Sequence, residues 1–225
     1  MRVGKKEIES EDFTSLLGAC QEIASAYPDG IVFIGGIAVY MHAINHETTR
    51  SLAEFTHDAD FYISLADMSD LRDAEEVTPN RRLSKHPLIK RGFEFDIYTE
   101  RQSSLIVPYD QVIAHAVVYD GVKVSGIEHL MVLKLEAYRD RYASSKGQKD
   151  AKDLIRLALI AHIRSNAFDA NVCLGYLRDE HLDLLDRVAK GHEFLALAKG
   201  NAKEAKGMRQ KFVKIVEQVR RKDKC

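Results

Sequence analysis

The sequence predicts an α/β (α+β) fold, in which an N-terminal mixed sheet with flanking helices is followed by a C-terminal helical bundle. Two observations lead to this prediction. Short apolar runs bounded by Gly, Pro and Asp, which are typical of strands, occur only before residue 126. From Ile127 onward the apolar residues recur at helical spacing instead. We therefore expect two domains, residues 1–126 and 127–225, and a chain of 225 residues is long enough for each to bury a core.

The first domain opens with an expected helix at residues 11–27, whose apolar residues share one face and whose N-cap is Ser10. Pro28-Asp29-Gly30 ends this helix ahead of the apolar strand Ile31–Ile34. The other elements expected here are a helix at 36–43, a polar loop at 45–56, a strand at 58–64, a strand near Leu83 or Leu88-Ile89, a strand at 93–99, and strands at 112–118 and 122–124 that flank the turn Tyr119-Asp120-Gly121.

The second domain is expected to consist of helices alone. Apolar spacing and helix-starting residues place these helices at 128–143, 149–165, 172–178, 180–190 and about 202–221.

The composition points to a cytoplasmic protein. No apolar run approaches the length of a membrane span, and Met1–Lys6 leads into acidic residues rather than into an apolar signal core. Cys20, Cys173 and Cys225 are widely separated, with no pair at metal-ligand spacing, so we expect reduced thiols, with Cys20 as a small core residue.

The charge is distributed unevenly. Residues 199–225 contain ten Lys/Arg and three Asp/Glu, although the net charge of the whole chain is −1. A basic helix of this kind favours contact with an RNA backbone. Basic residues near a helix C-terminus also complement its dipole or remain solvated, so both interpretations stay open.

A candidate phosphate and metal site follows the first strand. Gly35-Gly36 opens a helix there, and a glycine turn at a helix N-terminus offers bare N–H groups to a phosphate. Asp58 and Asp60 alternate in the next strand, so both side chains point to one face and repel each other unless a cation lies between them. Taken singly, these acids are equally typical of a turn or a strand end.

A third acid, Asp96, lies in a strand whose other residues read as largely buried. If that strand neighbours the one carrying Asp58 and Asp60, the three carboxylates form a site for one or two Mg²⁺ ions, which prefer oxygen ligands. Such a site beside a phosphate cradle is typical of nucleotidyl or phosphoryl transfer.

The helical domain also carries candidate residues. Lys134 stands in an otherwise apolar helical turn, where a lysine is rarely buried without a partner and can reach a phosphate. Asp150 and Asp153 are three residues apart and share a helix face, although acids in a first helical turn are also favoured by the dipole.

These motifs, in this order, resemble those of the nucleotidyltransferase superfamily, specifically the AbiE-type (AbiEii) toxin family. Gly35-Gly36 with Asp58 and Asp60 matches the first family motif, and Asp96 matches an apolar-x-apolar-Asp strand. The third and fourth motifs match Lys134-Leu135-Glu136-Ala137 and the set Lys149, Asp150 and Asp153.

Two departures from the family pattern stand out. Gly147 occupies the position of the fourth motif's arginine, a role that Lys146 supplies unless the contact is lost. The 21 residues between Gly36 and Asp58 exceed the usual spacing, which predicts that 45–56 forms an inserted loop over the nucleotide site.

The resemblance implies a Mg²⁺-dependent nucleotidyltransferase with an NTP as substrate. It implies that Asp58, Asp60 and Asp96 bind the metal, and that Gly35, Gly36, Thr56, Lys134 and Lys149 bind the nucleotide. Asp96 is a ligand of a second ion or the base, and Asp150 or Asp153 closes the catalytic site. Arg50 and His57 are secondary contacts or solvated loop residues.

The expected acceptor is an RNA, above all tRNA, and the expected partner is a cognate antitoxin protein, with no membrane involved. Two alternatives remain: a small-molecule enzyme that adds a nucleotide to an antibiotic, and an inactive nucleotide-binding module. Intact acids at 58, 60 and 96 argue against the second.

Overall fold

The computed structural model describes residues 5–78, 85–101, 104–164 and 168–220. They form two compact units, of which the first comprises Met1–Met41 with Ala53–Gly126 and the second His42–Leu52 with Ile127–Cys225. Within the described ranges, no helix is long and apolar enough to cross a membrane.

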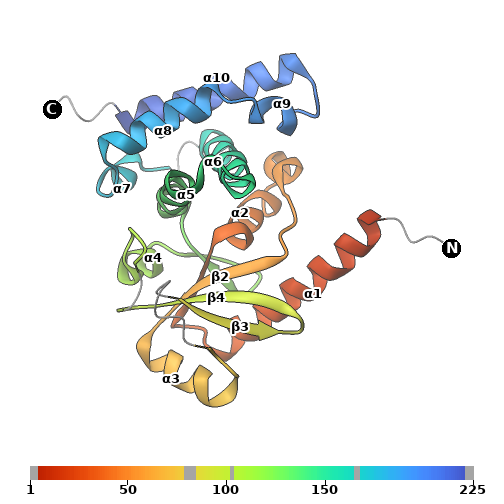
Figure 1. Ribbon diagram of the computed structural model, residues 1–225, viewed down its shortest axis with the longest axis vertical. Coiled ribbons are helices and arrows are strands. Elements are labelled where there is room, and N and C mark those ends of the chain that lie inside the picture. The colour runs from red at the N-terminus through yellow and green to blue at the C-terminus, as the bar shows by residue number, and fades with distance from the viewer. Residues whose placement is uncertain (1–4, 79–84, 102–103, 165–167, 221–225) are drawn as a thin grey trace. The chain divides into compact units, whose positions relative to one another are not determined.

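A six-stranded mixed sheet forms the centre of the first unit, in the order β3-β4-β2-β1-β6-β5 (Figure 1). β2 pairs antiparallel with β1 and parallel with β4, and β1 pairs parallel with β6. This arrangement confirms the predicted mixed sheet. The strands are β1 (Ile31–Ile34), β2 (Asp58–Ile63), β3 (His86–Lys90), β4 (Phe93–Thr99), β5 (Val117–Tyr119) and β6 (Val122–Val124).

One face of this sheet is a continuous apolar core. The rings of Phe33 and Phe61, opposite each other on β1 and β2, have centroids 5.4 Å apart, and those of Phe61 and Phe95 lie 6.3 Å apart. All three side chains are fully buried. Because side chains alternate along a strand, burying this face fixes which residues of β2 and β4 point to the other one.

The helices of the first unit correct two of the predicted boundaries. α1 (Lys5–Ala26) begins well before Ser10, so the N-cap prediction is wrong: the Ser10 carbonyl instead accepts a bond from Thr14 within the helix. Residues of the predicted strand 112–118 are divided between α4 (Tyr109–Ala114) and the short strand β5. The turn between β5 and β6 is confirmed at Asp120-Gly121, whose φ angles are 49° and 79°.

α3 (Leu65–Ala74) fills part of the polar stretch after β2, where the sequence predicted no helix. Its N-cap is Ser64, whose hydroxyl accepts a hydrogen bond from the Asp67 amide at 3.1 Å. Leu83, one of the two expected strand positions, lies outside the described residues, and the strand is found at the other.

The second unit is a helical bundle, as predicted. α5 and α6 lie side by side, and α8 and α10 do the same (Figure 1). Phe194 and Phe212 pack edge to face at 5.7 Å between α9 and α10. The helices are α5 (Ile127–Arg141), α6 (Ser145–Ile163), α7 (Ala170–Leu174), α8 (Asp179–Lys190), α9 (Glu193–Leu197) and α10 (Ala202–Arg220).

Residues 45–56, predicted to be a polar loop, instead contain the 3₁₀ helix η1 (Glu47–Leu52). η1 follows α2 (Gly35–Ile44) and packs on α6. Thr49 is fully buried there, and its hydroxyl donates to the Ala43 carbonyl at 2.8 Å. The prediction missed this helix because Glu47–Leu52 is polar in sequence and is held by contacts with distant residues.

Candidate functional site

The three acids predicted in the first unit share one face of the sheet. β2 and β4 are parallel neighbours, and Asp60 lies opposite Asp96 in their register. Asp58 is two residues before Asp60 and therefore points to the same side. Ala59 and Phe95 are buried on the opposite face, whereas Asp58 is exposed and both Asp60 and Asp96 are partly exposed.

The glycine turn lies against this acidic face. β1 ends at Ile34, opposite Asp60, and Gly35 follows with a φ of 65°. A Cβ at Gly35 would lie 2.1 Å from Asp60 Oδ2, and one at Gly36 would lie 2.9 Å from Thr56 Oγ1. The two glycines therefore let both polar side chains approach the start of α2 closely.

Thr56 positions one carboxylate of the site. Its side chain is buried, and Oγ1 donates a hydrogen bond to Asp58 Oδ1 at 2.7 Å. The hydroxyl thus orients the Asp58 carboxylate, and it lies beside Gly36. The resemblance implied a phosphate contact for Thr56, and the contact found is with a site acid.

The two carboxylate oxygens of Asp96 have different surroundings. Its Oδ2 forms an ion pair with Lys85, directly before β3, and the two side chains are about a fifth exposed. Its Oδ1 is buried and has no hydrogen-bond partner among the residues that the structure describes. A buried carboxylate oxygen without a partner is costly, so this atom can accept a proton or a cation.

Sequence reasoning missed two residues of this face. Glu94 lies opposite Asp58 in the β2–β4 register, which gives the face a fourth acid, and Lys85 reaches Asp96 from the position directly before the edge strand β3. Alternation along Phe93–Thr99 places Glu94 and Asp96 on one face, so the sequence alone could have predicted Glu94 as a residue of this site. It could not have predicted Lys85, because that contact depends on the pairing of β3 with β4.

Tyrosines close the other end of the same face. Tyr62 follows Asp60 at the next inward position, and its hydroxyl donates to the Val107 carbonyl at 2.6 Å. Its ring contacts those of Tyr98 and Tyr109, with centroids 6.1 Å away in each case. Burial, with Asp67 and Glu100 nearby, raises the pKa of Tyr109 to about 12. The acids therefore occupy the end of β2 next to Gly35.

The donor set fits a hard divalent cation. Carboxylate oxygens are the ligands that Mg²⁺ prefers, and β2 and β4, as neighbouring strands about 4.8 Å apart, place these acids at adjacent positions of one face. In the described part of the chain, no three Asp, Glu, His or Cys side chains converge closely enough to hold a metal as they stand. Lys85 pairs with Asp96 and so neutralises part of the negative charge of this face.

The motif residues of the second unit form a buried ion-pair network between α5 and α6. Lys134 Nζ lies 2.8 Å from Asp153 Oδ2 and 3.6 Å from Asp150 Oδ1. All three residues are less than 9% exposed. Both acids lie inside α6, which begins at Ser145, so the dipole of a first turn does not explain them.

Two arginines that the sequence analysis did not identify complete this network. Arg141 binds both oxygens of Asp150, at 2.7 and 3.0 Å, and Arg156 donates to Asp153 Oδ1 at 2.9 Å. Burial lowers the pKa of the Arg156 guanidinium to about 10, which leaves it charged at neutral pH. Three cations and two carboxylates are thus held together between these helices.

The glycine at the arginine position of the fourth motif has a steric cause. A Cβ at Gly147 would lie 2.2 Å from the carbonyl oxygen of Arg141 and 2.7 Å from Tyr142 Cα. Because backbone atoms cannot move aside cheaply, no larger side chain fits at this turn. Lys146 and Lys149 are exposed on α6, Arg50 is exposed on η1, and His57 is exposed directly before β2.

The predicted site residues therefore fall in both units. Gly35, Gly36, Thr56, Asp58, Asp60 and Asp96 lie together in the first, and Lys134, Lys149, Asp150 and Asp153 lie in the second.

Comparison with known proteins rests on structure alone, since no family model and no curated protein matches this sequence. The crystal structure of JHP933 from Helicobacter pylori is 14% identical, covers 98% of this chain and 96% of its own, and gives a TM-score of 0.51. A crystal structure described as a putative nucleotidyltransferase from H. pylori is also 14% identical, covers 97% of this chain and 98% of its own, and gives 0.51.

The Megavirus polyadenylate synthase is 14% identical over 70% of this chain and 33% of its own, with a TM-score of 0.48. At such identities, the similarity to the two H. pylori structures establishes the fold and not the reaction. The chain has a nucleotidyltransferase-like fold.

Proposed function

We propose that this chain is a Mg²⁺-dependent nucleotidyltransferase that transfers a nucleoside monophosphate from an NTP to an RNA acceptor, above all tRNA. The observation that carries the proposal is the register that sets Asp58, Asp60 and Asp96 on one sheet face beside Gly35. The proposed biological role is that of an AbiEii-like toxin with a cognate antitoxin, which the order of the four sequence motifs supports.

Asp58, Asp60 and Asp96 are the proposed ligands of Mg²⁺. When bound, the ion supplies positive charge to the triphosphate and favours departure of pyrophosphate. Thr56 orients the Asp58 carboxylate, Gly35 keeps the space beside Asp60 free of side-chain atoms, and Gly36 does the same beside Thr56. The backbone amides at the start of α2 then face anionic oxygens without needing to reorganise during the reaction.

In the proposed reaction, an acceptor hydroxyl oxygen bonds to the α-phosphorus of the NTP. The bond from that phosphorus to the bridging oxygen breaks, and pyrophosphate leaves with the electron pair. The hydroxyl proton passes to a carboxylate, for which Asp96 Oδ1 is the best candidate because it is buried without a partner in the described residues. Lys134, Asp150 and Asp153 enter the proposal as positioning residues, since they bind one another.

A label-transfer assay tests this function. The protein is incubated with Mg²⁺, each α-labelled NTP in turn, and total cell RNA with a protein lysate. We expect label on RNA with the wild type, and none above background with Asp58→Asn or Asp60→Asn. Both variants should fold normally, because removing one of two repelling acids does not cost stability.

The matched control is Glu94→Gln, which removes an exposed acid from the same face. It should retain activity within a few-fold, and its inactivation would contradict the proposed ligand set. Label on protein instead of RNA would keep the chemistry and change the acceptor. Absence of label on any macromolecule, with NTP still bound, would favour a small-molecule acceptor.

A further inference from the structure

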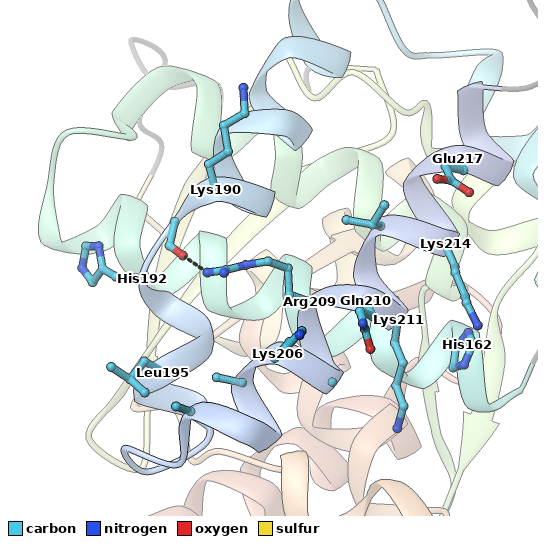
Figure 2. A pocket seen from close by; sticks show the side chains of 15 residues that line it. His162, Lys190, His192, Leu195, Lys206, Arg209, Gln210, Lys211, Lys214 and Glu217 are labelled. Atoms are coloured by element: carbon cyan, nitrogen blue, oxygen red, sulfur yellow. Dashed lines mark hydrogen bonds between the residues drawn. The ribbon is translucent and has the colours of Figure 1, made fainter.

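The second unit contains an open groove that the proposed chemistry does not use. It has a volume of about 1350 Å³ and is lined by the end of α6, the link from α8 to α9, and one face of α10 (Figure 2). The opposite face of α10 is buried in the bundle through residues such as Phe212 and Ile215. The side chains that α10 presents to the groove are therefore fixed by the packing of its apolar face.

The lining of this groove is strongly basic. Its charged residues are five cations and one acid: Lys190, Lys206, Arg209, Lys211, Lys214 and Glu217. Arg209 is engaged, because it donates to the Gly191 carbonyl at 2.8 Å and lies over the Phe194 ring. In the described residues, no carboxylate comes within ion-pair distance of the four lysines, so within this part of the chain their charge is open to an anionic ligand.

Burial and the positive charge of the groove both lower the pKa of a neighbouring histidine. His162 lies beside Lys214 at the α6 side of the groove (Figure 2). Burial lowers the pKa of this imidazole below its ordinary value, and Lys214 and Lys211 lower it further. The groove thus already disfavours one more positive charge, and an anion would relieve that repulsion.

The size and lining of the groove indicate a polymer that is bound by its backbone. Small-molecule pockets are commonly about 300–1,000 Å³. This groove is larger and open, and it is lined by five cationic side chains. None of its described lining residues is Phe, Tyr or Trp, and the rings in the described lining are the imidazoles of His162 and His192. Lysine ammonium groups act as flexible point charges that suit phosphates without fixing a sequence.

We infer that this groove binds the phosphodiester backbone of the RNA acceptor, independently of base sequence. The inference rests on the proposed function for the choice of RNA. Lys206 and Lys214 are eight residues apart on α10, which corresponds to about 12 Å along the helix. At about 3.4 Å per nucleotide of a helical strand, that length matches three or four phosphates. Lys190 supplies a further cation from the end of α8.

Fluorescence anisotropy with a labelled single-stranded RNA of about 20 nucleotides, longer than the groove requires, tests this inference without any NTP. At about −0.7 per phosphate, four contacts give a slope near −3 for log affinity against log salt. We therefore expect binding to weaken about 50-fold between about 50 and 200 mM salt. Lys211→Gln/Lys214→Gln should lower the slope by about 1.4 and weaken binding at least tenfold.

The matched control is Lys199→Gln/Lys203→Gln, which removes the same charge from exposed positions outside the groove lining. It should change affinity less than threefold. Equal losses in the two variants would mean general attraction rather than a groove, and would overturn the inference. Displacement of the RNA by polyglutamate at equal charge concentration would also overturn it, in favour of an acidic protein partner.

Two further arms separate this inference from its premises. DNA of the same sequence should bind no more tightly than RNA, and a tenfold preference for DNA would refute the assignment to an RNA acceptor. Asp58→Asn/Asp60→Asn should bind RNA like the wild type. Loss of transfer with binding intact therefore tests the proposed function, and loss of binding in the lysine variant alone tests the groove.

Discussion

At the scale of single residues, Gly35 shows how one backbone position controls a carboxylate. Its φ of 65° lies in the left-handed region, and the space a Cβ would fill contains Asp60 Oδ2. Alanine at this position therefore meets two separate penalties. One is conformational and costs about 1–2 kcal/mol, and the other displaces the Asp60 carboxylate from the turn.

We predict that Gly35→Ala lowers the free energy of unfolding by about 1–2 kcal/mol and reduces nucleotide transfer about 100-fold. The stability loss stays modest because the Asp60 carboxylate can rotate away from the new Cβ. The activity loss is large because the rotated carboxylate no longer lies at the turn. Urea titration measures the first quantity and the label-transfer assay the second.

Gly92→Ala is the matched control, since Gly92 has a φ of 83° and nothing within 4 Å of its Cβ position. It should lose similar stability and keep its activity. Equal activity in the two variants would show that displacing Asp60 does not matter for the reaction.

At the scale of elements, the ion-pair network couples α5 to α6. Lys134 and Asp153 are 10% and 5% exposed at their side chains, so neither charge is well solvated. Removing one partner leaves the other charge buried, which usually costs about 3–5 kcal/mol. The network explains why a lysine stands in an otherwise apolar turn.

We predict that Asp153→Ala destabilises the protein by about 3–5 kcal/mol, because the buried cations Lys134 and Arg156 both lose the carboxylate with which they pair. Chemical denaturation followed by circular dichroism measures the loss. Lys146→Ala, an exposed change on the same helix, should stay within about 0.5 kcal/mol. A small effect of Asp153→Ala would instead indicate that water reaches the network.

The sequence could predict individual strands, but it could not predict which elements pack against each other. Strands at 31–34 and 93–99 were predictable because apolar runs and alternation are local signals. Placing Asp58 and Asp60 on one face needed only the two-residue period of a strand. The pairing of Asp60 with Asp96 stayed conditional, and the contacts of Asp96 with Lys85 and of Lys134 with Asp153 were out of reach. Each depends on which elements become neighbours.

At the scale of the whole molecule, the two units are not continuous in sequence. α2 begins in the first unit at Gly35, and its last residues and η1 belong to the second. Thr49 in η1 is fully buried and bonded to Ala43, and Arg164 after α6 donates to the His42 carbonyl at 3.2 Å. A boundary placed at residue 126 alone would therefore divide the helical unit.

The assignment of η1 to the helical unit predicts which elements a substitution in η1 destabilises. Thr49→Val keeps the volume and removes a buried hydrogen bond, so it should cost about 1–2 kcal/mol. Amide hydrogen exchange should accelerate in α6, on which η1 packs, and remain unchanged in β2 and β4.

Thr99→Val is the control, since the Thr99 hydroxyl on β4 is buried with no hydrogen-bond partner in the described residues. That change should be neutral or stabilising. Faster exchange in β2 after Thr49→Val, despite the sequence proximity of residues 42–52 to that strand, would contradict the assignment of η1 to the helical unit.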